Sequence, residues 1–131
     1  MSPRKFPLRP ATHAEGVTRR RICEQYLEVA EIAAMDEGAA INVAVGVAVL
    51  AGIAASDAVC IAATGERYSG QDHAAAVTVL RRVDKRLGDR LKVLVDLKAA
   101  SHYGDSLLTV TDRERALRAA RTLVGAARER I

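Results

Sequence analysis

A lysine and a histidine lie four residues apart in a segment that otherwise has the pattern of an apolar helix. Lys98 and His102 continue the line of Leu94, because side chains at positions i and i+4 share one helix face. Metal-independent RNA cleavage needs a group that takes the 2′-hydroxyl proton, a group that protonates the leaving oxygen, and a cation. A histidine can fill either proton role near neutral pH, and a lysine can stabilise the developing anion. The spacing therefore offers His102 as acid or base and Lys98 as electrostatic stabiliser. The alternatives are solvation at a helix end and a structural pairing of His102 with an acid such as Asp57.

Asp57 is the acid that could complete such a site. It interrupts an apolar row between Ile53 and Ile61. A carboxylate in that row needs a hydrogen-bonding or cationic partner, because a bare buried charge is costly. We therefore predict that Asp57 lies within hydrogen-bonding reach of Lys98 or His102, although a partly exposed helix end fits the sequence equally well.

Three further residues are candidates for contacts with RNA or a nucleotide. The net charge of +4 and pI near 9.4 suit an anionic partner. Arg81 and Arg82 belong to a basic cluster, and Tyr103 follows His102 with a hydroxyl that could bond a phosphate. The alternative for the arginines is a solvated helix face, and the row that contains Tyr103 also suits packing.

The sequence contains no pattern for a metal or a cofactor. It has no glycine-rich phosphate loop, zinc spacing or nucleophile elbow, so we expect neither cofactor nor metal. His73 follows Asp72 at an expected helix start, where a solvated capping role is the simplest interpretation. Cys23 and Cys60 lie in apolar helical patterns, which predicts reduced, buried thiols in a cytoplasmic protein.

These residues must be positioned by helices. The 131 residues are 50% hydrophobic and only 3% aromatic, and the three prolines all precede residue 11. Alanine, valine and leucine without proline favour closely packed helices over strands. We predict an all-α fold, an up-and-down bundle of four to five helices over 12–131, preceded by a flexible basic tail over 1–11.

Local signals set the expected helix boundaries, which are 12–35, 39–64, 71–87, 89–103 and 111–130. Thr12 with Glu15, and Thr111 with Glu114, have the spacing of capping boxes. Gly88 and Asp89 are expected to separate the third and fourth helices, because glycine ends a helix and aspartate starts one. The segment 65–70 is expected to be a polar turn.

The second helix carries a row of small residues at every fourth position. The row consists of Ala40, Ala44, Ala48, Gly52 and Ser56. It would let another helix approach closely, either within the bundle or across a homodimer interface, and we expect a tight homodimer. The uncharged stretch 38–56 approaches membrane-spanning length, but acidic flanks and a missing aromatic belt favour a buried core helix and no membrane.

Helices two to five resemble the small bacterial HEPN-domain proteins. The resemblance lies in segments 49–58, 69–73, 97–103 and 116–124. It implies a homodimer with a cleft at its interface. Many members are metal-independent endoribonucleases of toxin–antitoxin or defence systems, often encoded beside a nucleotidyltransferase. Their site uses an arginine, four to six residues and a histidine; here Lys98 and Tyr103 resemble a lysine-and-tyrosine version of that segment.

Two functions follow as hypotheses. The one we favour is a HEPN-like interaction module, a component of a toxin–antitoxin or defence-type system, whose partners are a second copy, a nucleotidyltransferase and RNA or a nucleotide. The alternative is a metal-independent endoribonuclease in which Asp57 orients His102 and Lys98. A DNA-binding role would rest on the arginine clusters alone, without a helix-turn-helix pattern.

Overall fold

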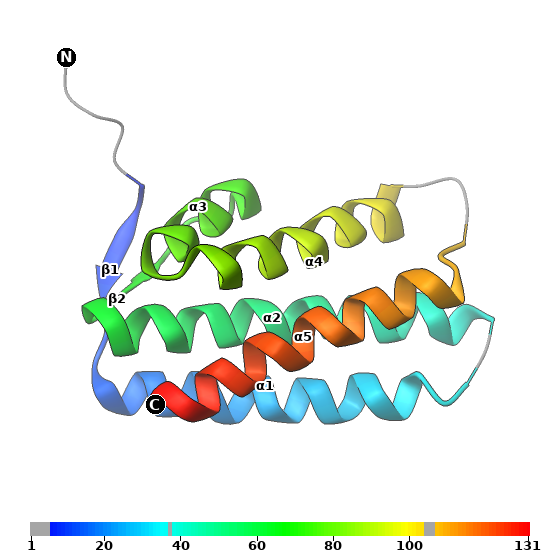
Figure 1. Cartoon of the computed structure of the whole chain (residues 1–131), viewed down its shortest axis with the longest axis horizontal. Helices are drawn as coiled ribbons and strands as arrows, with labels where there is room; N and C mark the ends of the chain where they lie inside the picture. The colour runs from blue at the N-terminus through cyan, green and yellow to red at the C-terminus, as the bar shows by residue number, and fades with distance from the viewer. Residues whose placement is uncertain (1–5, 37, 104–106) are drawn as a thin grey trace, which may run out of the picture.

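The protein is an all-α bundle with one small two-stranded sheet (Figure 1). The computed structural model describes residues 6–36, 38–103 and 107–131, except for the side chains of 39 and 101–103. The helices are α1 (His13–Ala33), α2 (Ala39–Thr64), α3 (His73–Val83), α4 (Lys85–Tyr103) and α5 (Val110–Arg130). Strand β1 (Leu8–Pro10) pairs with β2 (Glu66–Tyr68). The predicted helical bundle is thus confirmed.

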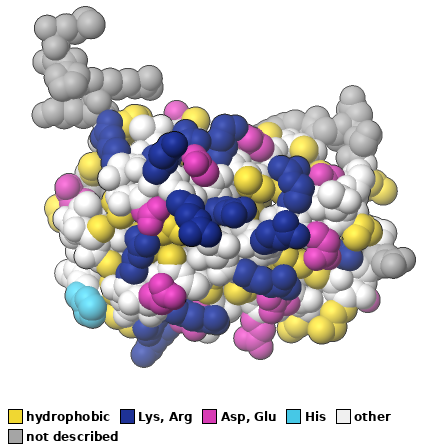
Figure 2. Space-filling model, in the orientation of Figure 1, with side chains coloured by type: hydrophobic (Ala, Val, Ile, Leu, Met, Phe, Trp, Pro, Cys, Tyr) yellow, Lys and Arg dark blue, Asp and Glu magenta, His cyan; other side chains and the backbone are white. Residues whose placement is uncertain are grey.

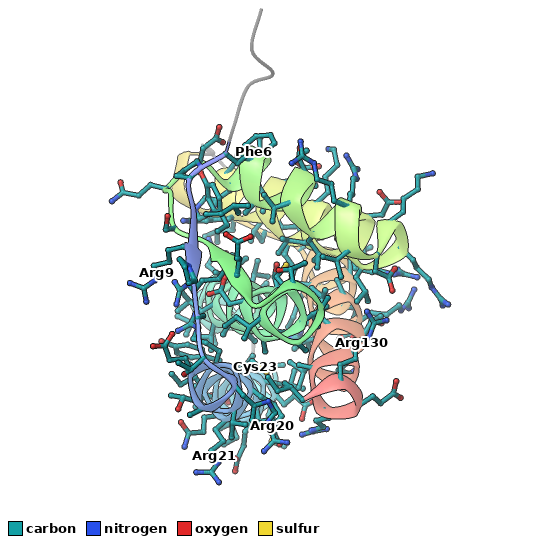
Figure 3. All side chains as sticks on the ribbon, turned by 90° about the vertical axis from the view of Figure 1, so that its left-hand side faces the viewer. Phe6, Arg9, Arg20, Arg21, Cys23 and Arg130 are labelled. Carbon is teal, nitrogen blue, oxygen red and sulfur yellow. The ribbon has the colours of Figure 1, made fainter. Side chains whose placement is uncertain are left out.

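Helix α2 forms the centre of the bundle. It packs against α1, α4 and α5, while α3 packs mainly on α4. In the view along α2, α1 lies below it, α4 above it and α5 to one side, with the two strands on the opposite side (Figure 3). An apolar helix with few large side chains suits this central place, because small residues allow three neighbours to approach closely.

The row of small residues on α2 faces this internal core. Ala44 and Ala48 are fully buried, and a Cβ added to Gly52 would collide with the Leu94 side chain of α4. The same Cβ would lie 3.3 Å from Cδ1 of Leu123 in α5. Of the two roles that the sequence left open, the row therefore fills the internal one, and it is not available to a second copy.

The start of α1 agrees with the sequence, whereas the start of α5 does not. The hydroxyl of Thr12 accepts a hydrogen bond from the amide of Glu15 at 3.1 Å, as the first capping pattern predicted. Helix α5 is capped by Thr109 with Asp112, not by Thr111 with Glu114. Both pairs have the same spacing, so the local pattern alone could not choose between them.

The boundary between α3 and α4 also differs from the prediction. It falls at Asp84, whose backbone is extended and whose carboxylate accepts a hydrogen bond from the amide of Leu87. Gly88 lies inside α4, where an added Cβ would come within 2.9 Å of the Arg81 backbone. The glycine thus serves the close crossing of two helices, rather than ending one of them.

The N-terminal segment is not a loose tail throughout. Leu8, Arg9 and Pro10 pair with Tyr68, Arg67 and Glu66 in an antiparallel register. The backbone and hydroxyl of Ser69 both donate to the carbonyl of Pro7, which extends the attachment. The segment 65–70, expected to be a polar turn, contains strand β2. The paired strands β1 and β2 therefore form a strap across the end of α2.

Within the described part of the chain, one helix is long and apolar enough to cross a membrane. It is α2 over Ala40–Thr64, and 78% of its apolar window is buried by the rest of the protein. Helix α2 is therefore largely covered by the rest of the bundle, as expected from the sequence for a core helix.

Candidate functional site

Asp57 is the acidic centre of a buried cluster with two arginines. Its residue surface is only 7% exposed, and Oδ2 lies 3.1 Å from Nη2 of Arg19 and 3.5 Å from Nη2 of Arg67. The prediction of a cationic partner is correct, but among the described residues the cations are Arg19 and Arg67 and not Lys98; the His102 side chain lies outside this description. Arg19 comes from α1 and Arg67 from β2, so the strap and the first helix supply both charges.

Burial and the two neighbouring arginines have opposite effects on the pKa of Asp57. Burial raises the pKa of its carboxyl above the ordinary value, and this effect outweighs the lowering by Arg67 and Arg19. The carboxylate is therefore largely removed from water, and its charge is compensated by the two guanidinium groups that contact it. In such a place Asp57 fixes the two guanidinium groups more than it stabilises the fold.

Lys98 contacts His73 of α3. Its Nζ lies 2.7 Å from Nε2 of His73. Burial and then the charge of Lys98 lower the pKa of His73, so at neutral pH the imidazole is uncharged and Nε2 can accept from the ammonium. His73 is half-buried, not a solvated cap; the capping role at this helix start belongs to the carboxylate of Asp72.

Two adjoining cavities connect these groups. The inner cavity has a volume of about 110 Å³ and is lined by Arg19, Asp57, Arg67 and His73, among others. The outer cleft, of about 590 Å³, is lined by Gly70, Gln71, His73, Val95, Lys98 and Ala99. Gly70 and His73 line both, so the cavities meet at the start of α3. The charged residues on the walls of the two cavities are three cations, Arg19, Arg67 and Lys98, and one carboxylate, Asp57. The net charge of the walls is therefore +2.

The other predicted site residues lie apart from this pair of cavities or outside the description. The side chains of His102 and Tyr103 are outside the described residues, so their predicted roles remain predictions. Arg81 forms an ion pair with Asp89 at 2.9 Å, and Arg82 lies over the Phe6 ring, 4.8 Å from its centroid. Both arginines thus have intramolecular partners, although their side chains remain exposed.

Basic side chains also gather on the face formed by α4 and α5 (Figure 2). Two of them, Arg121 and Arg128, pair with Glu31 and Glu24 of α1 at 2.8 and 3.2 Å. Ion pairs as exposed as these contribute at most about 1 kcal/mol each. This face therefore combines a modest α1–α5 seam with a solvated basic surface.

One side of α2 is left without a helical neighbour. Val43, Gly46, Leu50 and Ile53, spaced by three or four residues, form what we call the open stripe. Val43 is 56% and Leu50 45% exposed, and a Cβ at Gly46 would meet nothing within 4 Å. Large apolar side chains arranged in a line on a surface are typical of an interaction site.

Sequence reasoning missed Arg19, Arg67 and His73. In the sequence, Arg19 is one of three consecutive arginines over 19–21, and Arg67 lies in the segment expected to be a polar turn. Nothing local signals that either meets Asp57, because each comes from a different element.

Comparison with models of known protein families gave no match, and comparison with curated proteins gave none either. Among the described residues, no group of His, Cys, Asp and Glu has the arrangement of a metal site.

Proposed function

We propose that the protein is a HEPN-like helical interaction module that pairs with a second copy of itself through the open stripe of α2. The observation that carries this proposal is the exposed apolar line of Val43, Gly46 and Leu50 on an otherwise buried helix. A small residue such as Gly46 within the stripe lets the helix of a second copy cross closely, and two-fold symmetric dimers are the commonest soluble homo-oligomers.

Gly46 gives the strongest support for a second copy as the occupant. Glycine inside a helix costs roughly 0.5–1 kcal/mol relative to alanine. At Gly52 the close approach of Leu94 explains the glycine, but no atom of the described residues approaches Gly46 in the same way. A backbone that comes close from outside would explain it.

The wider role in a toxin–antitoxin or defence-type system rests on the resemblance to HEPN-domain proteins. On this proposal a nucleotidyltransferase is the second partner, and the pair works in the cytoplasm. Two free, buried cysteines suit a reducing compartment.

Self-association is tested by light scattering and sedimentation at micromolar concentration. We expect the wild-type chain to have the mass of two copies. Leu50→Arg places a charge in the stripe and should give a monomer, and Gly46→Ala should weaken the dimer while leaving the monomer at least as stable.

Gly125→Ala supplies the matched control. Gly125 is also a mid-helix glycine, on α5, whose added Cβ would meet nothing within 4 Å. It should gain helix stability without any change in mass. A wild-type monomer, or a Leu50→Arg chain that remains dimeric with its helical content intact, would overturn the proposal.

A second candidate function, metal-independent RNA cleavage, is favoured by the contact between Lys98 and the neutral His73. In this reaction the 2′-oxygen attacks phosphorus and the 5′-oxygen leaves, which forms a 2′,3′-cyclic phosphate and a 5′-hydroxyl. A base accepts the 2′-hydroxyl proton and an acid protonates the 5′-oxygen. Lys98 would stabilise the extra negative charge, and His102 would transfer the protons.

Cleavage of RNA in EDTA tests this candidate. The activity should fall on His102→Ala and only partly on Lys98→Arg, which keeps the charge. His73→Ala separates the contribution of the observed neighbour of Lys98 from that of His102. Cleavage that survives His102→Ala, or that needs added magnesium, would contradict the mechanism.

A further inference from the structure

The inner cavity beside Asp57 is built around two arginines that are held before any ligand arrives. Asp57 is nine-tenths buried and its Oδ2 contacts one terminal nitrogen of each guanidinium group. Each guanidinium carries five N–H donors, so both retain donors for a second acceptor. The side chains of Arg19 and Arg67 are 24% and 25% exposed, which leaves each of them within reach of a ligand.

The charge on the cavity walls fits a phosphate group. Three cations and one carboxylate line the two cavities, giving a net charge of +2. A phosphate monoester carries about −1.5 to −2 at pH 7. Arginine is suited to such a group, because its planar fork can donate two parallel hydrogen bonds to phosphate oxygens.

The outer cleft offers different chemistry from the inner cavity. Its volume of about 590 Å³ is several times larger, and its walls include the amide of Gln71 and the apolar side chains of Val95 and Ala99. An amide can both donate to and accept from a heterocyclic base, while apolar side chains can pack on its face. Lys98 lies in this cleft and contacts His73, which lines both cavities.

We propose that the joined cavities bind a nucleotide by its terminal phosphate monoester, with the phosphate between Arg19 and Arg67 and the nucleoside in the outer cleft beside Gln71, Val95 and Lys98. This site is distinct from Arg81 and Arg82, which the sequence suggested for nucleotide contacts. It does not depend on the self-association of α2, and it requires no cleavage of the ligand.

Calorimetry on the full chain tests the site with adenosine 5′-monophosphate, adenosine and inorganic phosphate as probes. We expect the monophosphate to bind, inorganic phosphate to bind more weakly, and adenosine to bind at least about tenfold more weakly than the monophosphate, since it lacks the charged group. A short RNA with a 5′-phosphate, compared with the same RNA carrying a 5′-hydroxyl, separates a free nucleotide from an RNA end as the source. A 5′-phosphate that strengthens RNA binding assigns the site to RNA ends, and binding of the free nucleotide alone assigns it to small nucleotides.

Three variants locate the ligand. Arg67→Gln and Lys98→Gln should each weaken binding of the monophosphate by about tenfold or more. Arg118→Gln is the matched control, because Arg118 is an exposed arginine on α5 that forms no ion pair with another described residue. Lys98 is not a partner of Asp57, so its replacement leaves the arginine cluster intact if Arg67→Gln unfolds the strap. Equal binding of adenosine and its monophosphate, no binding of the monophosphate, or an equal loss in Arg118→Gln would overturn the proposal.

Discussion

At the scale of single residues, the unusual feature is a carboxylate inside an apolar core. Asp57 is buried with Arg19 and Arg67, and its burial raises its pKa despite both arginines. A raised pKa in the folded state means that the folded chain binds the proton more tightly than the unfolded chain. The stability contributed by this group is therefore present at low pH and is lost as the pH rises through the folded pKa.

This sign gives a prediction for Asp57→Asn. The asparagine cannot titrate, so the free energy of unfolding of wild type minus that of the variant should decrease from about pH 4 upward, through the folded pKa. Urea unfolding of both chains at several pH values measures this difference. A difference that grows with pH would mean that the arginines, and not burial, dominate the carboxylate.

The two cysteines give a second prediction at this scale. Burial raises the pKa of both Cys23 and Cys60 to about 11. Since only the thiolate is nucleophilic, neither residue should be alkylated by iodoacetamide in the folded protein at pH 8. Mass spectrometry should find both unmodified in buffer and both modified in denaturant. Fast labelling of Cys60 in the folded chain would contradict this prediction and show that the thiol is reached by solvent through the inner cavity, which it lines.

At the scale of elements, the central helix α2 can pack against several helices at once because small residues lie at its contacts with them. Gly52→Ala adds a Cβ where the side chains of Leu94 and Leu123 already pack. We expect a loss of roughly 1–3 kcal/mol in the free energy of unfolding, since overpacking outweighs the better helix propensity of alanine. The control is Gly125→Ala, which should gain about 0.5–1 kcal/mol. Denaturant unfolding measures both; equal effects of the two substitutions would contradict the close packing around Gly52.

Two threonines near the start of α5 have the sequence pattern of a helix cap, but only Thr109 caps the helix. The side chains of Thr109 and Asp112 each accept a hydrogen bond from the backbone amide of the other, whereas Thr111 lies inside the helix. Thr109→Ala should therefore cost about 0.5–2 kcal/mol of stability, and Thr111→Ala much less. Thermal unfolding followed by circular dichroism compares them directly. The opposite order would place the start of α5 at the position that the sequence first indicated.

At the scale of the whole molecule, the strap connects the start of the chain to the end of α2. It includes the β1–β2 pairing, the Ser69–Pro7 hydrogen bonds and the Arg82–Phe6 contact. The five helices pack without it, but Arg67 is placed by it. The strap is therefore a small contributor to the fold and a large one to the arginine cluster.

A chain that begins at Ala11 tests this division. It should keep its helical circular dichroism and lose roughly 1–3 kcal/mol of stability, because a few hydrogen bonds at about 0.5–1.5 kcal/mol each are removed. Binding of adenosine monophosphate should also weaken, under conditions in which the shortened chain is still fully folded, because Arg67 has lost the strand that pairs with it. Loss of all helical structure would mean that the strap is part of the folding core.

The sequence by itself determined the helical architecture. Proline-free stretches, the Thr12 cap and apolar residues at helical spacing fixed α1 and α2 almost to the residue. These signals are local, because a cap or a helix face is read within a few neighbouring positions. The same reasoning failed at Gly88, which packs against the Arg81 backbone, and at Thr111, because Thr109 with Asp112 offers the same capping spacing two residues earlier.

Only the tertiary structure decided the composition of the site. Asp57 clearly needed a cation, but the chain has many, and only the packing of α1 and the pairing of β1 with β2 select Arg19 and Arg67. His73 meets Lys98 because α3 folds back on α4, a contact across 25 residues that has no local signature. The face of α2 that stays open was likewise settled by which sides its neighbours cover. Such contacts depend on the arrangement of whole elements, and the sequence of each element is compatible with several arrangements.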